Sequence, residues 1–155
     1  MEELKALARD KEKKSRVRGE AYSIWLSTLT PANFMLVIGG SLLSLVAGAS
    51  LLLHQGILSK EVAGLMALVS SAFTLIHNKL NCDQHQAECR KLRGIFRGMA
   101  EEYENLQSET DVDILKSKLD ALNDARAQVL KTAGAEPSEK SLEKAVSVVE
   151  RRSGS

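Results

Sequence analysis

Histidine and cysteine, the side chains that most often bind transition metals, gather in one short segment of this chain. The four residues are His77, Cys82, His85 and Cys89. On a helix, spacings of three and four place Cys82 beside His85, or His85 beside Cys89, so either pair could supply two ligands of one ion. Cys82 and Cys89 would lie about 10 Å apart along the axis, so a zinc site would need ligands from another helix or subunit. We therefore predict no metal site and no cofactor.

Signatures of catalysis are missing from the sequence. It contains no phosphate-binding glycine loop, no nucleophile elbow and no HExxH pair. We expect that the protein is not an enzyme.

Hydroxyl and amide side chains form a strip inside an apolar segment. Ser71, Thr74 and Asn78 share one helix face, and Ser70 and His77 lie beside it. Such a strip could line a water-filled path in an oligomer, and simple packing is the alternative, because hydroxyls also bond to the carbonyls of their own helix. The segment contains no Asp, Glu, Lys or Arg, which argues against ion-coupled transport. The pore-lining candidates are Ser70, Ser71, Thr74, His77 and Asn78.

Small residues recur every four positions in two segments. Gly40, Ser44 and Gly48 form one stripe, and Ala63, Ala67 and Ser71 form the other. Small side chains let helix backbones approach closely where lipid supplies no hydrophobic driving force. The stripes predict packing within one helical hairpin or between subunits, and we expect a homo-oligomer in either case. The helix-packing candidates are Gly40, Ser44, Gly48, Ala63 and Ala67.

The hydroxyl, amide and small residues named above lie in two segments without formal charge. The first extends from Ala21 to Ser59 and the second from Val62 to Asn78. The core of the first run, Ala32 to Leu53, would extend about 33 Å as a helix, which is enough to cross a bilayer core of about 30 Å. The second run is at the short end of the spanning range, and Lys79 could extend it by snorkelling. We predict two transmembrane helices joined by a short turn at 54–61.

The remaining sequence is charged and helical in pattern. Net charge is +1 and 26% of residues are charged, but only Lys60 and Glu61 carry charge between residues 21 and 78. We predict an all-α fold in which one continuous helix covers about 62–107. The predicted regions are 1–30, a cytoplasmic amphipathic or interfacial helix; 31–81, a transmembrane hairpin; 82–133, a cytoplasmic helical hairpin; and 134–155, a short terminal helix and tail.

Local signals indicate where these helices begin. Pro31 suits the first turn of the first span, with Thr30 as its N-cap, and Tyr22 suits an interfacial aromatic position. Thr110–Asp113 resembles a capping box before a helix with a near-heptad seam, which is formed by Val112, Leu115, Leu119, Leu122 and Val129. Pro137 and Ser138 begin a last helix over 138–152.

Basic residues flank both spans, whereas the turn contains only Lys60. Positive charge favours the cytoplasmic side, so we predict cytoplasmic termini. Basic side chains next to the membrane suit anionic lipid headgroups, and the candidates for this contact are Lys14, Arg16, Arg18, Lys79, Arg90, Lys91 and Arg93.

The segment HNKLNCDQHQAECRKLRGIFRGMAEEYENL, after a two-helix hairpin and before an acidic helical hairpin, resembles the SLATT family. These are two-transmembrane effector domains found beside bacterial nucleotide-signalling and defence genes. The resemblance covers roughly residues 15–137 and centres on His85, Tyr103 and Leu106. It implies an inner-membrane effector that oligomerises and forms a pore or perturbs the membrane in antiphage defence.

Two other functions fit the same layout. One is a non-conducting membrane anchor or scaffold that recruits a cytoplasmic partner. The other is a holin-like protein, although its cytoplasmic part would be far longer than lesion formation needs. The expected partners are membrane lipid, other copies of the chain and a cytoplasmic regulatory protein or nucleotide-signalling partner, with no nucleic acid.

Overall fold

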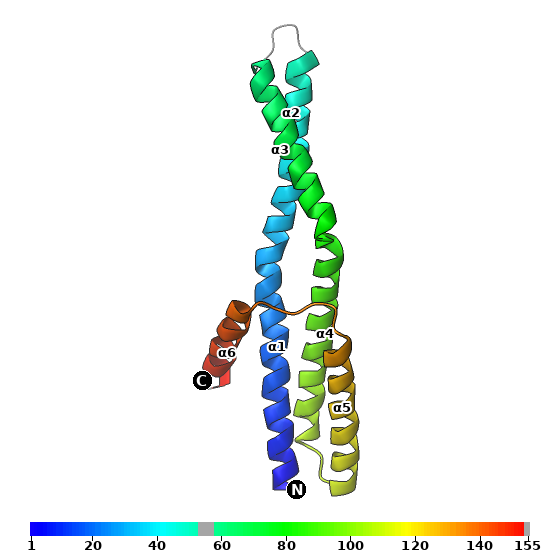
Figure 1. The fold of residues 1–155 in the computed structure, drawn as a ribbon. Coiled ribbons are helices and arrows are strands. Elements are labelled where there is room, and N and C mark those ends of the chain that lie inside the picture. The colour runs from blue at the N-terminus through cyan, green and yellow to red at the C-terminus, as the bar shows by residue number, and fades with distance from the viewer. Residues whose placement is uncertain (53–57, 154–155) are drawn as a thin grey trace. The chain divides into compact units, whose positions relative to one another are not determined.

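The computed structural model describes residues 1–52 and 58–153, and every regular element in these ranges is a helix. The all-α prediction is confirmed there (Figure 1). Residues 54–57 of the predicted turn at 54–61 lie outside the described residues. In chain order the elements are α1 (Glu2–Phe34), the π-helical turn η1 (Met35–Gly39), α2 (Gly40–Leu52), α3 (Lys60–Lys79), α4 (Cys82–Leu106), α5 (Val112–Thr132) and α6 (Glu139–Ser153).

The first three elements form one unbroken helix, Glu2–Leu52. By length and composition it is the one helix in the described part that could cross a membrane, with a mean hydropathy of 2.1 over its most apolar 18 residues. Pro31 lies inside α1, so the predicted helix start with Thr30 as N-cap is wrong. Proline removes one backbone hydrogen bond, whereas ending a helix leaves several groups unpaired, and an apolar segment offers these groups no water.

The predicted continuous helix over 62–107 is wrong at its middle. α3 ends at Lys79, and Asn81 has a φ of +46° before α4 begins at Cys82. Asparagine enters this left-handed region more readily than most residues, which is why it often follows the end of a helix. The Leu80 N–H still donates to the Ile76 carbonyl (3.0 Å), and the His85 N–H donates to the Asn81 carbonyl (2.9 Å).

The chain divides into two compact units, of which the first contains residues 1–27 and 87–155 and the second contains 28–86. The first unit is a helical bundle with a core along one face of α4. Leu92, Phe96, Met99, Tyr103 and Leu106 are all buried there. From α5, Leu115, Leu119 and Leu122 join this core, whereas Val112, predicted on the same seam, is exposed.

Tyr22 lies at the centre of the first unit and not at the predicted interfacial position. Its side chain is fully buried, and its ring stacks on Phe96 with centroids 6.0 Å apart. Its hydroxyl donates to the carbonyl of Ala135 (2.8 Å), which fixes the segment between α5 and α6. Burial raises the pKa of the Tyr22 hydroxyl to about 12.

The starts of the two C-terminal helices agree closely with the sequence signals. Asp111 caps α5, because its Oδ1 accepts from the N–H groups of Asp113 (2.9 Å) and Ile114 (3.1 Å). The cap therefore lies one residue after Thr110, where the capping-box pattern began. The last helix, predicted over 138–152, is α6 (Glu139–Ser153).

Candidate functional site in the apolar helix pair

In the second unit, α2 packs against α3, and a hydrogen bond joins the two helices at Gly40 and Ser70. The Ser70 hydroxyl donates to the carbonyl of Gly40 over 2.6 Å. A Cβ on Gly40 would lie 3.4 Å from the Cβ of Phe73, which is the short end of ordinary van der Waals contact, so a small residue suits this position. The π-helical turn η1 ends at this crossing, and π-turns are concentrated at functional sites.

The packed faces have a seven-residue spacing and not the predicted four-residue spacing. On α2 the buried residues are Gly40, Ala47 and Ser50, and on α3 they are Ala63 and Ser70. Ser44, Gly48 and Ala67, predicted on the packing stripes, are exposed. Two helices that cross at a small angle meet every 3.5 residues on average, so each buries positions seven apart.

The five pore-lining candidates are on two different faces of α3. Ser70 and His77 face the neighbouring helices of the unit, whereas Ser71, Thr74 and Asn78 are exposed. The hydroxyls of Ser71 and Thr74 donate to the carbonyls of Ala67 (2.9 Å) and Ser70 (3.2 Å) on their own helix. The exposed face therefore keeps a polar strip of three residues, and the two hydroxyls in it already bond within α3.

His77 belongs to a polar network that joins three helices. Its Nδ1 lies 2.8 Å from Oδ1 of Asn33, and its Nε2 lies 3.5 Å from Oδ2 of Asp83. The Asn33 amide donates to Oδ1 of Asp83 (2.7 Å), and the Gln86 amide donates to the carbonyl of Leu29 (3.1 Å). Sequence reasoning missed this network, since Asn33 and Asp83 are distant in the chain and neither belongs to a motif. The one available signal was that both lie at the polar ends of apolar segments.

The basic residues proposed to contact lipid headgroups have varied surroundings. Lys14 pairs with Asp10 (2.7 Å), Arg16 pairs with Glu12 (2.6 Å), and the Arg18 guanidinium lies 5.8 Å from the centroid of the Phe96 ring. In the second unit, Lys79 is exposed at the end of α3. The candidates on α4 are Arg90 and Lys91, which are exposed, and Arg93, which is half-buried.

Both cysteines are free thiols. Cys89 is buried in the first unit, and this burial, with a smaller contribution from Glu88, raises the pKa of its thiol. Within residues 1–52 and 58–153, no group of three His, Cys, Asp or Glu side chains could hold a metal ion.

Comparisons with protein-family models, with curated proteins and with solved structures find no match to this chain. The features of this site must therefore support any functional proposal by themselves.

Proposed function

We propose that the chain is a bacterial inner-membrane effector that oligomerises and permeabilises the membrane, in keeping with its resemblance to the SLATT family. In this proposal α2 and α3 both span the bilayer, and both termini are cytoplasmic. The trigger acts on the cytoplasmic helices, and antiphage defence by cell suicide is the expected setting.

The apolar outer surface of the α2 and α3 pair carries this proposal. Large aliphatic side chains face outward from both helices, and Leu45, Leu68 and Leu75 each expose more than two thirds of their surface. Burial of one such side chain contributes about 1.5–3 kcal/mol, so this surface is costly to leave in water. No formal charge interrupts it between Ala32 and Leu52 or between Val62 and Asn78. A bilayer or other copies of the chain would cover such a surface.

The exposed strip of Ser71, Thr74 and Asn78 supports a conducting oligomer. If several copies turn this face of α3 inward, the pore is lined by hydroxyl and amide groups without charge. Such a lining would conduct ions with weak selectivity. Ser70 and His77 are excluded from this lining because they bond to Gly40 and Asn33 within one copy.

Dye and ion release from liposomes tests this proposal. The double variant Ser71→Leu and Thr74→Leu should lower release at least tenfold and leave the oligomer's mass unchanged. A matched control, Ser41→Leu with Ser44→Leu, replaces two exposed hydroxyl residues on α2 and should keep its release. Unchanged release from the α3 variant would refute the lining assignment. Tight vesicles with every oligomeric preparation would refute the pore.

A non-conducting scaffold is the second candidate, and one feature of the first unit favours it. An open groove of about 430 Å³ lies between α4 and α5, lined in part by Leu106, Leu122 and Ala125 and bordered by Glu102 and Glu109. Glu109 is already paired with Lys118 of the same groove (3.1 Å), so a partner segment would contact mainly the apolar lining and Glu102. The scaffold predicts that other apolar spans of equal length keep the function, and that expression is not toxic. The pore predicts the reverse of both.

A further inference from the structure

The first unit contains a second cavity, open to solvent on one side and lined by residues of α1, α4 and α6, with a volume of about 540 Å³. This volume is within the range of about 300–1,000 Å³ that is typical of small-molecule sites. It does not depend on the membrane helices, because all of its lining residues belong to the first unit.

The described lining of this cavity is unusually rich in cations. Its five basic side chains are Arg9, Lys13, Arg16, Arg97 and Arg152. Its three acidic side chains are Glu12, Glu20 and Glu101. The lining itself therefore has two more basic than acidic side chains, and two further carboxylates, Glu104 and Glu150, pair with Arg16 and Lys13 from beside it.

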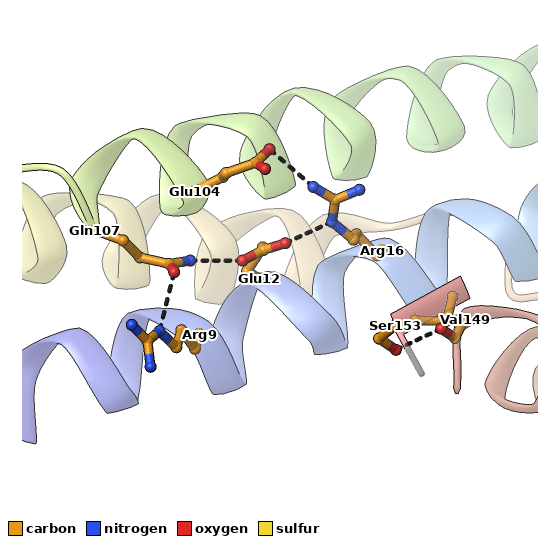
Figure 2. A network of polar contacts seen from close by, with 7 residues as sticks. All are labelled: Arg9, Glu12, Arg16, Glu104, Gln107, Val149 and Ser153. Carbon is orange, nitrogen blue, oxygen red and sulfur yellow. Dashed lines mark hydrogen bonds and ion pairs between the residues drawn. The ribbon is translucent and has the colours of Figure 1, made fainter. Parts of the chain in front are cut away.

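Two of these cations are held firmly by acidic partners. Arg16 bonds to Glu12 (2.6 Å) and to Glu104 (2.8 Å), and Lys13 pairs with Glu150 on α6 (3.2 Å). Figure 2 shows the first of these groups, in which Arg16 on α1 lies between Glu12 on its own helix and Glu104 on α4. The Arg16–Glu104 pair joins α1 to α4, and the Lys13–Glu150 pair joins α1 to α6.

The guanidinium groups of Arg9, Arg97 and Arg152 have weaker contacts with acidic side chains. Arg97 and Arg152 both approach Oε2 of Glu20, and each is 3.8 Å away. Charge-assisted hydrogen bonds are normally 2.7–2.9 Å long, so both contacts are loose. Nε of Arg9 donates to the neutral amide of Gln107 (3.1 Å), as Figure 2 shows. The side chains of Arg97 and Arg152 are 54% and 72% exposed, which leaves them free to turn toward a ligand.

We propose that this cavity binds a small phosphate-bearing molecule, with Arg97, Arg152 and Arg9 as the phosphate ligands. The guanidinium fork matches the geometry of phosphate oxygens and can donate two hydrogen bonds to them. Ala100 and Val149 are both buried and supply an apolar floor for the organic part of the ligand. Because Arg152 is on α6 and Arg97 is on α4, the bound phosphate joins these two helices.

Calorimetric titration of the full-length protein in a nonionic detergent at low salt tests the site. The probes are inorganic pyrophosphate, adenosine 5′-monophosphate and adenosine. Pyrophosphate and the nucleotide should bind, and adenosine should not, since it lacks the phosphate. Binding should weaken as salt is added. No heat of binding with either phosphate probe would overturn the proposal.

Substitutions locate the site and separate it from general attraction to positive charge. Arg97→Gln and Arg152→Gln should each weaken binding about tenfold, which corresponds to one charge-assisted hydrogen bond. Arg151→Gln is the matched control, because Arg151 is the neighbouring residue on α6 and does not line the cavity. Glu20→Gln should tighten binding, since it removes the carboxylate that competes for both arginines. An equal loss in Arg151→Gln and Arg152→Gln would overturn the assignment.

The phosphate could come from a soluble molecule or from a lipid headgroup, and bilayers distinguish the two sources. The nucleotide titration is repeated with the protein in phosphatidylcholine vesicles, with and without phosphatidylglycerol. Equal affinity in both indicates a soluble ligand. If phosphatidylglycerol weakens nucleotide binding, and this competition is lost in Arg152→Gln, the natural ligand is a lipid headgroup. Competition that persists in this variant would contradict a phosphate site at Arg152.

Discussion

The crossing of α2 and α3 makes a sharp prediction about two adjacent serines. Ser70 is buried and donates to the Gly40 carbonyl at 2.6 Å, whereas Ser71 is exposed and bonds only within its own helix. A leucine at position 70 has no space between the two backbones. A leucine at position 71 adds one more apolar side chain to a surface that is already apolar. Ser70→Leu should therefore separate the helices, and Ser71→Leu should not.

The expected magnitude follows from two contributions. Overpacking at a close contact costs about 1–3 kcal/mol. Loss of one hydrogen bond between helices in a membrane environment costs about 0.6 kcal/mol on average. Together these give about 2–4 kcal/mol, or roughly a 30- to 700-fold increase in the open population of the helix pair. For Ser71→Leu we expect a change within about 0.5 kcal/mol.

Thiol reactivity measures the opening of the helix pair directly. Ala63 is fully buried against α2, and a reporter Ala63→Cys reacts with a maleimide only when the pair opens. The rate in detergent micelles then follows the open population. Peptide mass spectrometry separates this site from Cys82 and Cys89, which serve as internal references in the same protein. Ser70→Leu should raise the reporter's rate at least 30-fold over the parent. Equal rates for the Ser70 and Ser71 variants would falsify the crossing geometry.

Three further substitutions test the first unit by its melting temperature in detergent. Tyr22→Phe leaves the buried Ala135 carbonyl without its donor and should cost about 1–3 kcal/mol. In the parent protein, the pKa of Tyr22 is raised to about 12, and the stability linked to this shift is complete below pH 10. It is lost as the pH rises from 10 toward 12. Tyr22→Phe has no group to ionise here, so this alkaline loss of stability should be absent in the variant. Asp111→Ala removes the cap of α5 and should cost about 0.5–2 kcal/mol, with a smaller effect for Asp113→Ala. Leu119→Ala should lower the free energy of unfolding by about 2–5 kcal/mol, whereas Val112→Ala, at an exposed position, should change it little. Equal losses of stability in these two variants would contradict the observed buried face of α5.

The sequence by itself determined which segments are helical and which helix faces of the first unit are buried. Leu92, Phe96 and Tyr103 recur at helical spacing, and burial of apolar area is the dominant force, so periodicity was enough to find their core. The starts of α5 and α6 were also readable, because capping uses side chains within a few residues of the backbone groups they satisfy.

Only the tertiary structure decided how the apolar helices meet. α2 and α3 are apolar on most of their surface, so no single hydrophobic face indicates where the neighbouring helix packs. The four-residue stripes of small residues therefore could not show which of these residues are buried. The contact of Gly40 with Ser70, the placing of His77 between Asn33 and Asp83, and the left-handed turn at Asn81 all depend on residues distant in the chain or on one local backbone angle. The cationic cavity has the same origin. Its arginines come from three helices, and only folding brings two of them, Arg97 and Arg152, to one carboxylate, Glu20.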